Sequence, residues 1–212
     1  MKTVAVLDYG MSNLRSVSRA LEQVAGEAWQ VKIATTPEQV AQADKIVFPG
    51  QGAIGNCMRL LADTGLDQAV QESIRHKPFL GICLGMQSLL HHSEESGGVA
   101  GFGLIPGTVR RFTDFLRDPL TGGYLKIPHM GWNQVHQAIA HPLWHHIDND
   151  SRFYFVHSYY ADPENKQVIA ATTAYPTPFV SAVAYDNVFA VQFHPEKSQH
   201  AGLQLLQNFL AW

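Results

Sequence analysis

Four short apolar segments recur in the first half of the chain, and each is followed by residues that favour a turn or a helix. They are rich in β-branched residues and contain almost no polar alternation: Thr3–Leu7, Val31–Ala34, Ile46–Phe48 and Phe79–Ile82. Strands of this kind have both faces buried, as in a parallel sheet with helices on both faces. The pattern therefore predicts an α/β fold built on a central, mostly parallel sheet.

The segments between these strands carry helical signals. Leucine and valine recur every three or four positions from Leu14 to Val24, after Ser12 or Asn13, either of which suits a helix N-cap. Further helices are expected at Pro37–Ala43, Gly55–Ala62, Leu66–Arg75 and His200–Leu210. Beyond Gly101 the strand signals become short, which predicts antiparallel additions to the sheet in the C-terminal half. The expected later strands are Val168–Thr173, Ser181–Ala184 and Val188–Phe193.

Composition limits the classes of protein to consider. The 212 residues suit a single domain, 1–212, and a net charge of −3 gives no reason to expect a nucleic acid or a membrane surface as partner. No apolar run approaches the roughly 18 residues of a membrane span. Two cysteines and no secretory signal favour a reducing compartment, so we expect a cytoplasmic protein.

Cys83 lies at the centre of Gly-Ile-Cys-Leu-Gly, directly after an apolar strand. Glycines on both sides allow a strand to turn abruptly into a helix, which is the pattern of a nucleophile elbow. A helix over Leu84–His92 is expected to follow, and its dipole would favour the thiolate. A buried structural thiol remains the alternative on this motif alone.

Two further motifs bear on that choice. In His194-Pro195-Glu196 the imidazole and the carboxylate are two residues apart, so on an extended segment they share a face and form a base with its orienting group. In Phe48–Gly52 ("FPGQG"), Gly50 and Gly52 let backbone N–H groups approach a ligand oxygen. Together with the Leu84 N–H they are candidates for an oxyanion hole.

With these three motifs in view, the chain resembles the class I, triad-type glutamine amidotransferases. "PGQG", "GICLGMQ" and "HPE" occur in that family's order and at its usual distances. The resemblance implies a triad of Cys83, His194 and Glu196 that hydrolyses glutamine to glutamate and ammonia. It also implies that Gln87, Glu95, Ser158 and Tyr159 bind the glutamine backbone.

Further segments are similar to the glutaminase subunits of imidazole glycerol phosphate synthase, of histidine biosynthesis. They are "DYGMSNLRSV", "PHMGWN", "HSYY" and "QFHPEKSQHAGLQLLQNFL". This similarity implies a heterodimer with a (β/α)₈ cyclase subunit that receives the ammonia. Asn13, Trp132, Asn133 and Lys197 would border that interface, with Lys197 facing an acidic group of the cyclase.

Two alternatives remain open: a glutaminase that serves another acceptor, such as pyridoxal phosphate synthesis, and a non-catalytic regulatory module on the same fold. We expect no cofactor and no metal, since neither His91-His92 nor His145-His146 belongs to a set of residues with ligand spacing. Cys57 lies in a predicted helix without an acid–base partner and is expected to be a core thiol.

Overall fold

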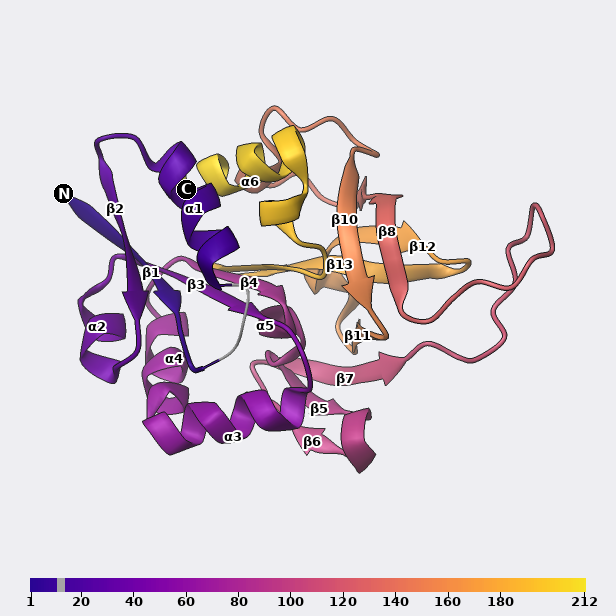
Figure 1. Cartoon of the computed structure of the whole chain (residues 1–212), viewed down its shortest axis with the longest axis horizontal. Coiled ribbons are helices and arrows are strands. Elements are labelled where there is room, and N and C mark those ends of the chain that lie inside the picture. Colours follow the sequence, from indigo (N-terminus) through magenta and orange to yellow (C-terminus); the bar gives the residue numbers. More distant parts are fainter. Residues whose placement is uncertain (11–13) are drawn as a thin grey trace.

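The computed structural model describes residues 1–10 and 14–212, and Figure 1 shows the arrangement of its elements. The strands are β1 (Lys2–Leu7), β2 (Trp29–Ala34), β3 (Lys45–Gly50), β4 (Phe79–Cys83), β5 (Leu90–Ser93), β6 (Val99–Ala100), β7 (Ile105–Arg111), β8 (His129–Gln134), β9 (His136–Gln137), β10 (Arg152–His157), β11 (Tyr159–Pro163), β12 (Ile169–Ala174), β13 (Pro178–Tyr185) and β14 (Val188–Val191). The α-helices are α1 (Leu14–Ala25), α2 (Pro37–Gln42), α3 (Ile54–Thr64), α4 (Leu66–Ile74), α5 (Leu84–Gln87) and α6 (Gln199–Ala211). Short 3₁₀ turns are η1 (Glu95–Gly97), η2 (Pro142–Trp144), η3 (Lys166–Val168) and η4 (Pro195–Lys197).

The main sheet has the strand order β2-β1-β3-β4-β14-β13-β11-β7-β5-β6, and β12 joins β9 to β13. The first five strands of this order pair in parallel, whereas β13, β11 and β12 pair antiparallel with their neighbours. Strands β8 and β10 form a separate two-stranded sheet. The expected mostly parallel sheet with antiparallel additions in the C-terminal half is confirmed.

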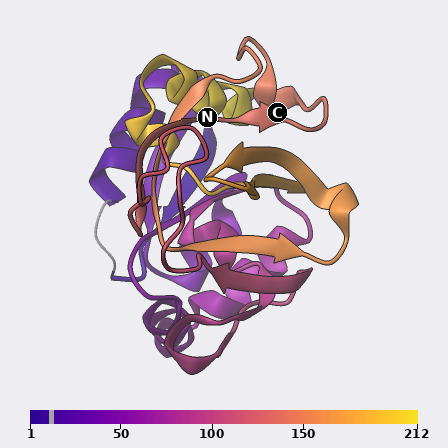
Figure 2. The same cartoon turned by 90° about the vertical axis from the view of Figure 1, so that its right-hand side faces the viewer.

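Helices cover both faces of the sheet, as the apolar strands predicted. Val4 and Val6 of β1 belong to one core cluster with α1 and α6, while Ala5 and Leu7 belong to a second cluster with α3 and α4. This division follows from the two-residue period of a strand. Figure 2 shows α1 and α6, in indigo and yellow, on the opposite side of the sheet from the purple and magenta helices.

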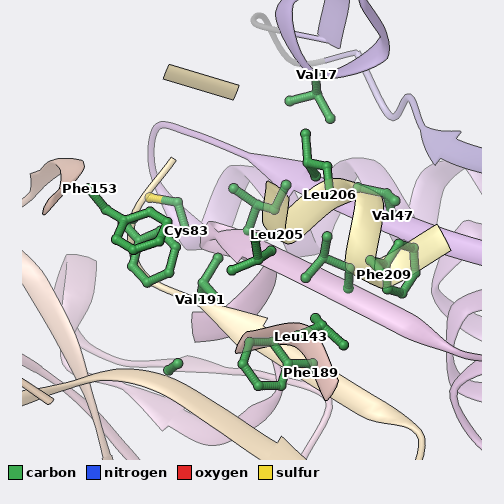
Figure 3. Packing of buried hydrophobic residues seen from close by; sticks show 14 of the residues in the cluster. Val17, Val47, Cys83, Leu143, Phe153, Phe189, Val191, Leu205, Leu206 and Phe209 are labelled. Atoms are coloured by element: carbon green, nitrogen blue, oxygen red, sulfur yellow. The ribbon is translucent and has the colours of Figure 1, made fainter. Parts of the chain in front are cut away.

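The first core cluster extends to the end of β4, where the candidate nucleophile lies. Figure 3 shows Cys83 at one side of this cluster, near Phe153 and Val191, with Leu205 and Leu206 of α6 packed beside it. The backbone of Cys83 is thus anchored on a close-packed support. None of the helices in the described part of the chain is both long enough and apolar enough to cross a membrane.

The expected helix over Leu84–His92 is wrong in its length. Helix α5 ends at Gln87, and the chain then enters β5. The loop after β6 and the start of β7 end the helix, because their N–H groups bind the carbonyl oxygens of the two residues that follow α5. Phe102 N–H donates to the Ser88 carbonyl at 2.7 Å and Ile105 N–H to the Leu89 carbonyl at 3.0 Å. A single helical turn supplies a much weaker dipole than the expected nine residues.

Candidate active site

Cys83 occupies a strained turn between β4 and α5. Its φ and ψ are 54° and −104°, a conformation that L-residues rarely adopt and that costs of the order of 1–3 kcal/mol. The residue is 7% exposed, so it is buried, and it lines the pocket described below. Such strain persists only where the surrounding structure enforces it, which fits the nucleophile elbow better than the core thiol.

The flanking glycines are required by close packing. A Cβ added to Gly81 would lie 2.8 Å from the Gly85 carbonyl oxygen and 3.0 Å from the Cβ of Ala190, its register partner on β14. A Cβ added to Gly85 would overlap the carbonyl oxygen of Phe48 on β3. The turn is therefore pressed against both neighbouring strands, which leaves the cysteine side chain only the direction toward the pocket.

His194 and Glu196 lie side by side, as their spacing predicted. The Nδ1 atom of His194 is 2.8 Å from Oε1 of Glu196, and both side chains are almost fully buried. The segment is not the continuous strand that we expected: β14 ends at Val191, and Glu196 lies in the 3₁₀ turn η4. Proline at position 195 starts that turn, where no sheet hydrogen bond is needed.

A set of backbone contacts fixes the position of this turn. The Ser198 hydroxyl donates to the His194 carbonyl at 2.6 Å and accepts from the Tyr154 N–H at 2.9 Å. The His194 N–H donates to the Tyr154 carbonyl at 2.9 Å. Helix α6 also approaches closely, because a Cβ on Gly202 would overlap the Pro195 carbonyl oxygen. The imidazole is thus held by β10 and by α6.

The neighbours of His194 determine its pKa. Burial alone lowers the pKa, but the facing Cys83 sulfur and the Glu196 carboxylate outweigh burial and raise it to about 10. The proton therefore stays on the imidazole while the sulfur and the carboxylate face it. A protonated imidazole opposite the sulfur is the arrangement that favours a nucleophilic thiolate.

A pocket of about 200 Å³ opens beside Cys83. It is smaller than the ~300–1,000 Å³ typical of sites for drug-sized ligands, which suits a small metabolite. Its lining includes six of the residues that the sequence predicted for the oxyanion hole and for substrate binding: Gly52, Leu84, Gln87, Glu95, Ser158 and Tyr159.

The three predicted oxyanion residues occupy different positions. Gly52 has a φ of +93° and lines the pocket with Leu84, the residue that follows the nucleophile. Gly50 pairs with Cys83 in the sheet and does not line the pocket; a Cβ there would lie 3.0 Å from that of Leu84 and would overlap the Tyr9 hydroxyl. Gly50 thus provides close packing beneath the turn.

Two of the predicted substrate-binding residues already make contacts in the pocket wall. The Gln87 amide donates to the Tyr159 carbonyl and to Oε1 of Gln192, each at 3.0 Å. Oε2 of Glu95 accepts the N–H of Ile54 at the start of α3, at 2.8 Å. These contacts fix the orientation of both side chains before any ligand binds.

Gln192 is a residue of this site that the sequence analysis missed. Its side-chain amide donates to the Cys83 sulfur at 3.5 Å, and the residue is fully buried. A signal was present: Gln192 is the one polar residue in the run "VFAVQF", two positions before His194 and therefore on the same face of an extended segment.

Two of the predicted interface residues, Trp132 and Lys197, lie beside the half-buried ring of Tyr154. The Trp132 ring meets the Tyr154 ring edge-on with centroids 6.1 Å apart, and the Lys197 ammonium lies 5.8 Å from the centre of the Tyr154 ring. Asn133 donates to the Ala174 carbonyl at 2.9 Å. Asn13, the fourth residue predicted for the interface, lies outside the described residues.

Comparison with known proteins agrees with this geometry. The profile of the family described as "Glutamine amidotransferase class-I" matches residues 5–212. Two relatives named "Imidazole glycerol phosphate synthase subunit HisH" cover all of this chain: one from Nitrosomonas europaea, 54% identical and matched over 99% of its length, and one from Nitrosococcus oceani, 55% identical and matched over 98%.

Solved structures show the same fold at low identity. The crystal structure of a protein from Thermoplasma acidophilum, described as a putative GMP synthase, has a TM-score of 0.70 at 20% identity, and the alignment covers 100% of this chain and 93% of that one. A second structure, described as a glutamine amidotransferase, has a TM-score of 0.72 at 16% identity, with 98% and 97% covered. The chain therefore belongs to the class I glutamine amidotransferases, and within them to the family of HisH subunits of imidazole glycerol phosphate synthase.

Proposed function

We propose that this chain hydrolyses L-glutamine to glutamate and ammonia and delivers the ammonia to a cyclase subunit that makes imidazole glycerol phosphate. The observation that carries the proposal is the 2.8 Å contact between His194 and Glu196, on an imidazole whose pKa is raised by the nearby Cys83 sulfur and by the Glu196 carboxylate. Residues 1–212 act together as one glutaminase domain in this proposal. Family membership supports it, because the two relatives named HisH match this chain over almost their full lengths.

The chemistry follows from the positions of the three side chains. The Cys83 thiolate attacks the side-chain amide carbon of glutamine, and the imidazolium of His194 donates its proton to the departing ammonia. A γ-glutamyl thioester remains on Cys83. His194, now neutral, takes a proton from water, which attacks the thioester and releases glutamate. Glu196 holds the imidazole in orientation and stabilises its positive form through both steps.

The pocket supplies the remaining contacts. The proposed donors to the tetrahedral oxyanion are two backbone N–H groups, that of Gly52 in the segment that starts at Gly50 and that of Leu84 directly after Cys83. Glu95 pairs with the α-ammonium of glutamine, and Ser158 and Tyr159 bind its α-carboxylate. Gln87 lines the same wall and orients the substrate backbone. The small volume of the pocket, about 200 Å³, supports an amino-acid substrate.

A partner is needed because ammonia released into water near neutral pH is mostly protonated and is then no nucleophile. The surface formed by β8 and the loop before it suits a protein partner, since it exposes large apolar side chains: Phe115, Leu120, Tyr124, Met130 and Trp132. We propose that the face of a (β/α)₈ cyclase covers this surface and borders Trp132, Asn133 and Asn13. Lys197, exposed beside Tyr154, would pair with an acidic group of the cyclase.

The test is glutamate release by the chain alone, with a cyclase subunit, and with the cyclase and its ribonucleotide substrate. We expect turnover to rise by at least about fivefold when both are present, which corresponds to a coupling free energy of about 1 kcal/mol. Equal turnover in all three conditions would contradict the assignment to imidazole glycerol phosphate synthase. Release of glutamate in each condition would still support a glutaminase that serves another acceptor.

A further inference from the structure

A continuous series of hydrogen bonds leads away from the Cys83 sulfur into the protein, on contacts that the triad does not use. The side-chain amide of Gln192 donates to the sulfur at 3.5 Å. Oε1 of Gln192 accepts from the Gln87 amide at 3.0 Å, and the same Gln87 amide donates to the Tyr159 carbonyl at 3.0 Å. These bonds join α5, β11 and the segment after β14.

The series continues from the Tyr159 carbonyl toward the surface. Nδ1 of His157 is 2.8 Å from that carbonyl oxygen, and Nε2 of His157 is 2.9 Å from Nδ1 of His129. Nε2 of His129 is 3.2 Å from the side-chain amide nitrogen of Asn133, which also donates to the Ala174 carbonyl at 2.9 Å. Asn133 is one of the residues predicted to border the partner.

Two backbone carbonyls fix the direction of every bond in this series. The Tyr159 carbonyl can only accept, so Gln87 must present its NH₂ group to it, Gln192 must present its oxygen to Gln87, and the NH₂ group of Gln192 must point at the sulfur. The same carbonyl requires the proton of His157 on Nδ1. The side-chain amides therefore cannot be flipped without placing two donors or two acceptors against each other.

The Ala174 carbonyl gives the same result from the other end. It requires the Asn133 NH₂ group as donor, so Nε2 of His129 must accept and Nδ1 of His129 must donate to Nε2 of His157. Nδ1 of His157 then donates to Tyr159, as the first carbonyl already demanded. Both ends thus assign the same tautomer, with the proton on Nδ1, to both histidines.

The histidines in this series are buried and neutral. His129 and His157 are 3% and 5% exposed. Burial lowers the pKa of His129 to about 4 and that of His157 to about 3, where nearby His129 and His194 add to the effect. Each ring therefore carries one proton near neutral pH, which is what the directed series requires. Phe155 and Tyr175 stack on His129 with ring centroids 4.9 and 4.0 Å away and hold its plane.

We propose that Gln192 is a further catalytic residue, which donates a hydrogen bond to the reacting sulfur, and that Gln87 is a positioning residue that holds its amide in that orientation. His157 and His129 are positioning residues for the Tyr159 carbonyl to which Gln87 donates. The proposal rests on the proposed glutaminase function and extends it. His194 and Gln192 then have separate tasks. His194 exchanges protons with the substrate, whereas the Gln192 amide does not titrate and stabilises negative charge on the sulfur before it attacks and again when the thioester is cleaved. The series ends at Asn133, so a partner that contacts Asn133 also contacts the end of this network.

The first test measures the rate at which iodoacetamide alkylates Cys83 at pH 7, with the labelled residue identified by peptide mass spectrometry. Gln192→Glu keeps an acceptor for Gln87 but removes the donor to the sulfur, so we expect alkylation of Cys83 to be about tenfold slower. In the complex with the cyclase, kcat for glutamine should fall by a similar factor while KM stays within about twofold, because Gln192 does not line the substrate pocket.

A second variant and a matched control keep this test independent of folding. Gln192→Met also removes the donor, without introducing a buried charge, and should slow alkylation in the same direction. Ser181→Ala is the control, because Ser181 is fully buried on the adjacent strand and its hydroxyl has no hydrogen-bond partner among the described residues. Alkylation of Cys83 at the wild-type rate in either folded Gln192 variant would overturn the proposal.

The second test determines the tautomers of His129 and His157 from the ¹⁵N chemical shifts of their rings at pH 7. We expect both His129 and His157 to be neutral with the proton on Nδ1, although isolated histidine favours Nε2. A proton on Nε2 of His157 would overturn the positioning role of the two histidines, because Nδ1 could then no longer donate to the Tyr159 carbonyl. Neither measurement needs glutamine. A wild-type Cys83 that does not react with iodoacetamide would overturn both the role of Gln192 and the proposed glutaminase function. A Cys83 that reacts equally fast in wild type and in all variants would overturn the role of Gln192 alone.

Discussion

Cys83→Ala is expected to lower glutamine hydrolysis by at least about 10⁴-fold, because the variant lacks the thiolate on which the proposed mechanism forms the γ-glutamyl intermediate. The alanine retains the backbone conformation at position 83 and removes only the sulfur, so the chain should still fold. Glutamate release by the variant in complex with the cyclase, compared with wild type, measures the effect. Residual turnover above about one hundredth of the wild-type rate would contradict a nucleophilic role for Cys83.

Two controls separate loss of chemistry from loss of structure. The Cys83→Ala complex should still form product when ammonium salt replaces glutamine, since the proposed cyclase reaction needs only ammonia. Cys57→Ala serves as the matched cysteine variant. Cys57 is fully buried in α3, and burial raises the pKa of its thiol to about 12 despite a hydrogen bond with Tyr9 that lowers it. Turnover per folded molecule should therefore be unchanged in Cys57→Ala.

Gly85→Ala is expected to be strongly destabilising for the addition of a single methyl group. The new Cβ would overlap the carbonyl oxygen of Phe48, and backbone on a central strand cannot move aside as a flexible side chain can. We expect the free energy of unfolding to fall by at least about 3 kcal/mol, which is the upper range for overpacked cores. Chemical denaturation followed by circular dichroism measures it.

Gly55→Ala is the matched control for Gly85→Ala, because Gly55 also lies in a helix. A Cβ at position 55 would meet only the Cγ2 atom of Val99 at 3.4 Å, an ordinary contact. Alanine is the better helix former by about 1 kcal/mol, so this variant should be as stable as wild type or slightly more stable. Equal destabilisation of both variants would show that close packing against β3 is not what requires glycine at position 85.

The sequence predicts the layered fold because burial on both faces of a strand leaves a local pattern. Val4–Leu7 and Ile46–Phe48 are apolar at every position, which only strands covered on both sides require. Where a strand lies at an edge the pattern weakens: in β2 only Ala34 is buried, and the other residues are exposed or partly buried. No local pattern predicts where α5 ends, because its end depends on the N–H groups of Phe102, in the loop after β6, and of Ile105, at the start of β7.

The candidate site divides in the same way. The turn at Cys83 depends on its flanking glycines, and the contact between His194 and Glu196 depends on their separation by two residues. Both features could therefore be predicted from neighbouring residues in the sequence. The bonds of Gln192 to Gln87 and to Cys83 span more than one hundred residues of sequence, and no local pattern encodes them. Gly50 was predicted for the oxyanion hole but packs against Tyr9 and Leu84 outside the pocket, and only the folded sheet brings these two residues beside it.

The most direct measurement of the central claim is stoichiometric labelling by a glutamine analogue that carries an electrophile, such as a diazoketone, in place of the side-chain amide. In the complex with the cyclase we predict one label per chain, located on Cys83 by peptide mass spectrometry, with labelling slowed by added glutamine. Absence of labelling, or a label on Cys57 with Cys83 unmodified, would contradict the claim that Cys83 is a nucleophile activated by His194 and Glu196.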